Sequence, residues 1–257
     1  MTQKKLQRLK WINLVTLIIV IIINALSNSL PFNGVTTGEL ADRLNVLFTP
    51  AGYVFSIWSV IYVLLVIWVI RPFISIKDAD YPAYERVGLA FLINGLLNGS
   101  WLVVFHYGYF ILSFLVMTAL LMTIIVIYSR INTSRSHVTV WMRLPFSVYM
   151  GWISVAFIVN SGVVLNSLGF EDGLWLSAEM WTIIGLIIAT LLAGYLTAVL
   201  KDALYLLVFI WAFVGIAVER WGEYTALSYT ALVSAAILGL LTLNMLVKWK
   251  GIYGKYD

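Results

Sequence analysis

Long apolar stretches separated by short polar loops run through the whole chain. Each stretch is close to the ~20 residues, about 30 Å at 1.5 Å per residue, that an α-helix needs to cross the hydrocarbon core of a membrane. A membrane-spanning β-strand needs only about 10 residues of alternating polarity, and no stretch alternates in this way. The pattern therefore predicts an all-α integral membrane protein, a bundle of eight transmembrane helices at residues 11–30, 51–70, 87–106, 110–129, 142–165, 178–199, 203–218 and 226–247.

The Lys and Arg residues fall almost wholly on alternate loops between these stretches. If the N-terminus lies in the cytoplasm, every one of the 16 Lys and Arg residues except Arg43 and Arg220 lies on the inner side. This bias sets the orientation of membrane proteins, whereas acidic residues contribute little. A miscount of one span would reverse the side of every later loop. We therefore expect cytoplasmic N- and C-termini, with the loops 31–50 and 166–177 outside.

The composition agrees with a multi-pass protein of the cell membrane, either plasma or inner. The chain is 62% hydrophobic and 11% charged, whereas about a quarter of the residues of a soluble domain are charged. The net charge of +4 follows from the inner loops, so it indicates contact with membrane lipids and requires no nucleic acid. The basic and apolar N-terminus has features of a signal peptide, but the seven later spans favour a retained first helix.

Ionisable groups are almost missing from the spans, where they are costly and generally functional. Glu179 and Glu219 lie at outer ends, Arg71 at an inner end, and His106 at the outer edge of the third span. We expect His106 to be an interfacial residue before a tight turn. No catalytic residue is predicted, because a proton relay or a Ser–His–Asp hydrolase lacks its parts. With no cysteine and few carboxylates, no metal site is predicted either.

Aromatic and amide side chains stand in the spans instead. Five of the 11 Trp residues, Trp11, Trp141, Trp175, Trp221 and Trp249, fall at predicted water boundaries, as in the usual aromatic belt. Trp58, Trp101 and Trp152 lie within or just inside spans that also contain Asn. Asn98 shares a helix face with Trp101, and Ala156 shares one with Trp152. This spacing fits amide bonds between helices, and it equally fits a pocket with aromatic walls for a flat apolar ligand.

Three motifs on three spans resemble those of the TspO/MBR family, the tryptophan-rich sensory proteins related to the mitochondrial translocator protein (peripheral benzodiazepine receptor). The order and the separation of the motifs agree with the family. Val148 stands where the family usually has Pro, and one residue fewer separates Gly from Trp in the first motif. The motifs are Thr49-Pro50-Ala51-Gly52, Phe55 and Trp58-Ser59-Val60-Ile61-Tyr62; Leu97-Asn98-Gly99-Ser100-Trp101 and Phe105; and Tyr149-Met150-Gly151-Trp152, Ala156 and Val159-Asn160.

The resemblance covers residues 10–165, so it implies a TspO-like five-helix membrane bundle at 1–168 and three additional transmembrane helices at 169–257. It also implies a cavity beneath the loop between the first two helices. Family members bind tetrapyrroles such as protoporphyrin IX there, and some bind sterols. Carried over residue by residue, the ligand-binding residues would be Trp58, Tyr62, Asn98, Trp101, Phe105, Trp152 and Ala156.

These expectations describe a TspO-like binding or sensory protein rather than an enzyme. Its partner would be a hydrophobic small molecule, a tetrapyrrole or a lipid, captured for transport, sensing or breakdown. No covalently bound cofactor is expected, but a porphyrin or haem-type ligand is. Trp-assisted porphyrin breakdown and a homodimer both stay open. The alternatives are a small-molecule transporter without ion-coupling carboxylates and a lipid-modifying membrane enzyme.

Overall fold

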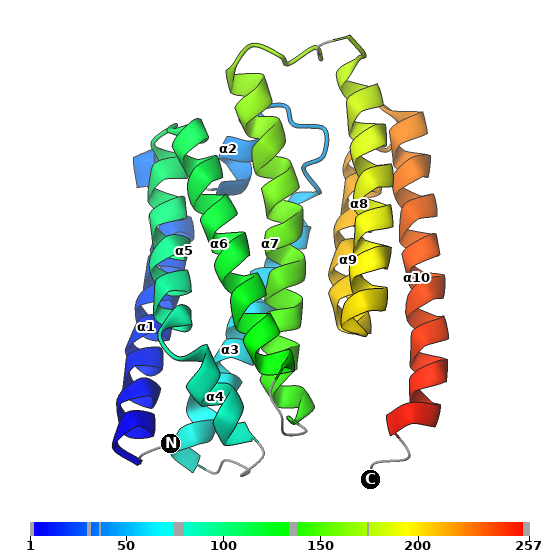
Figure 1. Ribbon diagram of the computed structural model, residues 1–257. Coiled ribbons are helices and arrows are strands. Elements are labelled where there is room, and N and C mark those ends of the chain that lie inside the picture. The colour runs from blue at the N-terminus through cyan, green and yellow to red at the C-terminus, as the bar shows by residue number, and fades with distance from the viewer. Residues whose placement is uncertain are drawn as a thin grey trace. The chain divides into compact units, whose positions relative to one another are not determined.

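The computed structural model describes residues 3–29, 32–35, 37–74, 80–133, 138–173 and 175–253. These residues form helices, turns and loops, with no strand among them (Figure 1). They belong to two compact units. Unit 1 comprises residues 1–44 and 56–164, and unit 2 comprises residues 45–55 and 165–257.

The helices of unit 1 come mainly from the first two-thirds of the chain. They are α1 (Gln3–Ser29), the short 3₁₀ turn η1 (Phe32–Gly34), α2 (Thr37–Arg43), α3 (Ile57–Ile74), α4 (Tyr81–Val87), α5 (Ala90–His106), α6 (Phe110–Asn132) and α7 (Val140–Ser167). Unit 2 contains α8 (Ala178–Leu200), α9 (Ala203–Glu219) and α10 (Thr225–Tyr253). The 3₁₀ turn η2 (Gly52–Ser56) leads from unit 2 into α3.

Helices coincide with all eight predicted stretches, and the multi-pass membrane fold is confirmed. Among the described residues, 6 helices are long and apolar enough to cross a membrane, namely α1, α3 with η2, α6, α7, α8 and α10. The bent pair α4 and α5 brings the number up to 7. Helix α9 is apolar but only 17 residues long, about 26 Å. Eight spans and cytoplasmic termini stay predictions.

The third predicted span, 87–106, is broken near its start. Helices α4 and α5 meet there at an angle of 50°. Gly88 has φ +53° and ψ −130°, a backbone conformation that residues with a side chain rarely adopt. Its N–H still donates to the Tyr84 carbonyl, at 3.2 Å. A glycine at this position therefore lets α4 turn aside while α5 continues as the apolar helix.

Aromatic packing around Trp68 joins four helices of unit 1. The Trp68 ring, on α3, is fully buried. It stacks on Tyr84 of α4 at 4.9 Å between centroids and meets Phe146 of α7 edge-on at 4.9 Å. Phe91 of α5 lies 5.2 Å away. Such pairs contribute about 0.5–1.5 kcal/mol each beyond the area they bury, so this cluster is a main part of the core.

Two of the Asn residues in the spans connect helices, as the amide interpretation of the sequence predicted. Asn94 on α5 donates to Thr123 Oγ1 of α6 at 2.8 Å. Asn160 on α7 donates to Ser113 Oγ of α6 at 3.2 Å. All four side chains lie inside unit 1, where an unpaired amide would be costly. Hydrogen bonds of this kind hold transmembrane helices together in the absence of a hydrophobic driving force.

In unit 2, residues 45–55 are held by α9 and the residue that follows it. The Arg220 guanidinium donates to the Val46 and Leu47 carbonyls, at 3.3 Å in each case. Ala51 N donates to the Gly215 carbonyl at 3.2 Å. A side chain at Gly215 would collide with Val54, so the glycine allows this close approach. The loop ahead of α3 is thus built into the unit that contains the last three helices.

Candidate ligand-binding site

Three aromatic residues of unit 1 contact the ring of Trp58, near the start of α3. Trp58 stacks on Tyr62, one turn later, with 5.6 Å between centroids and 17° between planes. Two rings of α7 meet it edge-on, Tyr149 at 5.9 Å and Trp152 at 6.3 Å. Trp152 and Tyr149 are buried, whereas Trp58 and Tyr62 are half-buried. The structure therefore brings together three of the seven predicted site residues, Trp58, Tyr62 and Trp152.

Asn98 reaches this cluster through a chain of buried hydrogen bonds. Its amide nitrogen donates to the Tyr149 hydroxyl at 3.1 Å. Its amide oxygen accepts from Asn24 of α1 at 2.8 Å. The chain Asn24–Asn98–Tyr149 connects α1, α5 and α7 beside Trp58. Asn98 is therefore next to the predicted site, and both hydrogen-bonding ends of its side chain bind protein.

Trp101 and Phe105 form a second aromatic pair, one turn apart on α5. Their rings stack at 5.1 Å between centroids. Phe105 also meets Phe110, at the start of α6, at 5.9 Å. Both residues of the pair are buried. Ala156 on α7 is half-buried and one turn after Trp152.

Two polar atoms in this region lack a partner. The Tyr62 hydroxyl and the Trp101 indole nitrogen are buried, and neither has a hydrogen-bond partner among the described residues. Leaving a buried polar group without a partner costs roughly 1–3 kcal/mol. Each of the two groups is a hydrogen-bond donor.

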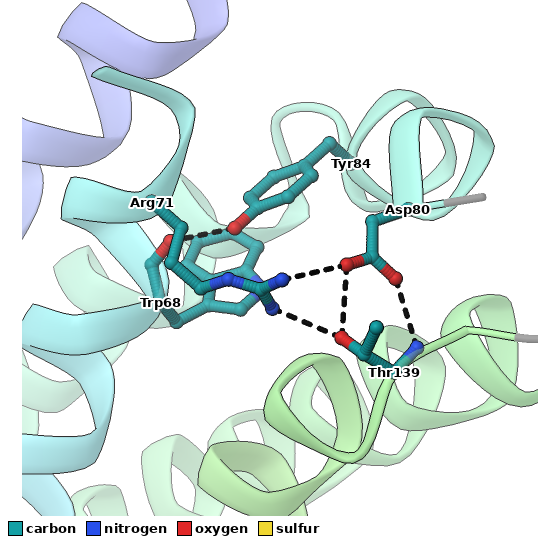
Figure 2. A network of polar contacts seen from close by, with 5 residues as sticks. All are labelled: Trp68, Arg71, Asp80, Tyr84 and Thr139. Carbon is teal, nitrogen blue, oxygen red and sulfur yellow. Dashed lines mark hydrogen bonds and ion pairs between the residues drawn. The ribbon is translucent and has the colours of Figure 1, made fainter. Parts of the chain in front are cut away.

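A separate polar network lies at the other end of α3 (Figure 2). Arg71 Nη2 is 2.9 Å from Oδ2 of Asp80, a fully buried carboxylate. Thr139, just before α7, donates its N–H and its hydroxyl to Asp80 at 2.9 and 2.8 Å. Arg71 Nη1 donates to Thr139 Oγ1 at 3.0 Å. The carboxylate is thus fully paired, and the network joins α3, α4 and α7.

His106 ends α5, as predicted, but its side chain is buried. Its Nδ1 lies 2.7 Å from the Leu102 carbonyl, and its Nε2 lies 3.4 Å from Thr37 Oγ1 of α2. The Asn33 amide donates to the His106 carbonyl at 3.2 Å. The histidine therefore fastens η1 and α2 to the end of α5. Among the described residues, no group of three or more His, Asp or Glu is arranged to hold a metal ion.

A cavity of about 790 Å³ lies elsewhere in unit 1, between α1 and α5. Its walls are mostly apolar side chains of the two helices, and none of the seven predicted site residues lines it. Gly95 and Gly99 are among the lining residues. A Cβ at Gly95 would lie 2.5 Å from Thr16 Cγ2, so these glycines set the close approach of α5 to α1.

The sequence analysis did not predict three residues of these contacts, namely Tyr149, Asn24 and Asp80. Tyr149 precedes Trp152 by three residues, which places both on one helix face; this spacing could have identified it. Asn24 is an amide within the first apolar stretch, a position where a polar side chain needs a partner. Asp80 precedes Tyr81-Pro82, a typical start of a helix. No sequence pattern indicates its burial against Arg71.

The fold and these contacts define a multi-pass helical membrane protein with an aromatic cluster inside its first unit. A family model described as "TSPO-like protein" matches residues 10–244, and the chain belongs to this family. The match extends beyond the three sequence motifs to α8, α9 and most of α10. The comparisons with curated proteins and with solved structures gave no match.

Proposed function

We propose that unit 1 binds a planar hydrophobic molecule, a porphyrin or similar tetrapyrrole, at the Trp58 cluster. The observation that carries this proposal is the set of contacts between Trp58 and the rings of Tyr62, Tyr149 and Trp152. Indole and phenol rings provide large apolar faces on which a flat macrocycle can stack. Membership of the TSPO-like family supports the same ligand class, which the family motifs imply.

The buried donors give such a ligand an orientation. The Tyr62 hydroxyl is one turn from Trp58, and the Trp101 indole N–H is one turn from Asn98. Ligand sites are generally apolar with a few well-placed polar groups. A tetrapyrrole with carboxylate side chains matches this combination of faces and donors. Binding would serve transport, sensing or breakdown of the ligand.

The experiment is a titration of the purified full-length protein with protoporphyrin IX, followed by quenching of Trp fluorescence. Trp58→Leu and Trp152→Leu keep an apolar side chain but remove the π face. Stacking is worth about 0.5–1.5 kcal/mol, so affinity should fall about two- to twelvefold in each variant. Trp175→Leu is the control, because Trp175 is 86% exposed in unit 2. Equal effects in all three variants, or no binding by the parent protein, would refute the proposal.

A further inference from the structure

The cavity between α1 and α5 is a groove that opens towards the surroundings of unit 1 rather than into its core. The two helices lie side by side (Figure 1). Several lining side chains are exposed, including Val15 and Ile19 of α1 and Leu96 of α5. The groove lies along the apolar parts of both helices. In a membrane it therefore faces the hydrocarbon region, and its volume of about 790 Å³ is within the usual range of ligand sites.

The length of the groove matches one leaflet of the membrane. On α1 it runs from Trp11 to Ile23, which is about 18 Å at 1.5 Å per residue. Half of the hydrocarbon core is about 15 Å. The groove is thus long enough for one acyl chain that enters from one membrane surface.

Positive charge marks the end of the groove at Trp11. Lys4, Arg8, Trp11 and Val15 follow the spacing i, i+4, i+7 and i+11, so they share one face of α1. Trp11 and Val15 line the groove, and Lys4 and Arg8 are exposed on the turns before it. The N-terminal end of α1 adds the positive end of its helix dipole. An acidic headgroup is therefore favoured where an acyl chain would leave the groove.

We propose that this groove binds an anionic glycerophospholipid, with one acyl chain against the exposed side chains of Val15, Ile19 and Leu96 and the phosphate beside Lys4 and Arg8. Lipid tails are as apolar as Leu, so apolar contact alone selects no lipid in a membrane. Selectivity comes from the positive charge at the end of the groove. A basic residue near the membrane surface favours an acidic lipid by about fivefold.

Two other occupants fit these observations less well. A second copy of the chain packed groove to groove would bring the same surface of each copy together. Lys4 and Arg8 of one copy would then lie near those of the other. A sterol has no phosphate, so it would leave the basic residues without a role. The anionic phospholipid is the occupant that uses both the groove and the charges.

Native mass spectrometry of the full-length protein with equal amounts of phosphatidylglycerol and phosphatidylcholine tests the proposal. Leu96→Trp fills the groove from its wall, and Leu115→Trp is its matched control on α6, because these residues are 61% and 59% exposed. The parent and Leu115→Trp should retain one phosphatidylglycerol that Leu96→Trp loses. Arg8→Gln should lower the preference for phosphatidylglycerol about fivefold without abolishing lipid binding.

Each opposite result overturns the proposal. Equal retention by Leu96→Trp and Leu115→Trp would show that lipid binds outside the groove. Equal retention of the two phospholipids by the parent would remove the role of Lys4 and Arg8. Displacement of phosphatidylglycerol by added cholesterol would assign the groove to a sterol. In both Trp variants the new ring lies on an exposed surface. Melting curves of the two variants test whether each is folded.

Discussion

The indole nitrogen of Trp211 donates a 3.0 Å hydrogen bond to the carbonyl of Val54, 157 residues earlier in the chain. The Trp211 ring also meets Tyr53 edge-on at 5.4 Å. With the contacts of Arg220, this bond fastens the segment that leads into α3 to helix α9. Helix α9, one of the C-terminal helices, therefore holds the segment that comes directly before Trp58 in the sequence.

We expect Trp211→Phe to loosen this segment while keeping most of the apolar contact. One hydrogen bond contributes about 0.5–1.5 kcal/mol net, so amide hydrogen exchange at Ala51 and Val54 should become about two- to twelvefold faster. Hydrogen exchange followed by mass spectrometry measures this. Trp221→Phe is the control, because its ring is exposed and contacts Tyr229 within unit 2. Unchanged exchange in Trp211→Phe would mean that the bond does not order the segment.

The sequence was sufficient for the helical class because the membrane requires long apolar stretches, which any helix here must have. It failed at the bend after α4. A single Gly88 inside an apolar run is compatible with a straight helix, and only packing decides otherwise. It also did not assign residues 45–55 to the unit of α8–α10. Their contacts with Gly215 and Arg220 join positions far apart in the chain, and no local periodicity records them.

The candidate site shows the same division. Helical spacing placed Trp152 and Ala156 on one face of a helix, because i, i+4 patterns describe single helices, but it did not indicate that Trp152 meets Trp58. Spacing could not decide whether Asn98 faces a ligand or another helix. That depends on Asn24 and Tyr149, which come from two other helices. Sequence patterns show which residues share one face of a helix, whereas the tertiary structure is needed to show which helix faces contact each other.

We expect the buried Arg71–Asp80 pair to contribute much more to the stability of unit 1 than the Lys5–Glu85 pair does. Asp80→Ala removes a fully buried carboxylate and leaves Arg71 and Thr139 without their acceptor. Breaking a buried pair in this way costs about 3–5 kcal/mol. Arg71 is 18% exposed and can recruit water, so we expect the lower end of that range. The thermal midpoint in detergent should fall clearly.

Glu85→Ala is the control for Asp80→Ala. Glu85 pairs with Lys5 at 2.9 Å, but the side chains of Lys5 and Glu85 are 56% and 35% exposed. Exposed pairs contribute little to stability, so the thermal midpoint should hardly change. A similar midpoint for the two variants would show that the network of Figure 2 does not stabilise unit 1.

The basic loops predict the orientation of the chain in the membrane. Single cysteines can be placed freely because the chain has none. Leu168→Cys, in the predicted outer loop, should react with an impermeant maleimide in intact cells. Asn132→Cys, at the end of α6 on the predicted inner side, should react only after lysis. Both positions are exposed. Ser134 and Arg135, in the same predicted inner loop, lie outside the described residues.

The labelling outcome has a direct consequence for the helix count. Labelling of both cysteines before lysis would place two loops on one side that the alternation of basic residues separates. The seventh predicted span can be examined in the same way, by comparing Lys201→Cys before α9 with Gly222→Cys after it. Both residues are exposed. Because α9 has only 17 residues, reaction of both from the same side would mean that it does not cross.

A substitution of Asn98 tests whether its side chain binds the ligand or holds helices together. Asn98→Ala removes the bonds to Asn24 and Tyr149. Bonds between transmembrane helices average about 0.6 kcal/mol each, so the loss should be about 1 kcal/mol, seen as a lower thermal midpoint in detergent. Since both ends of the amide bind protein, we expect porphyrin affinity per folded molecule to change less than it does in Trp58→Leu.

The comparison needs both quantities from one preparation of each variant. Asn132→Ala, an exposed amide at the end of α6, should leave both the thermal midpoint and porphyrin affinity as they are in the parent. If Asn98→Ala instead lowers affinity about tenfold and keeps the midpoint, Asn98 binds the ligand and exchanges its bond to Tyr149 for one to the porphyrin. The two measurements together therefore decide which of the two interpretations of the amide holds.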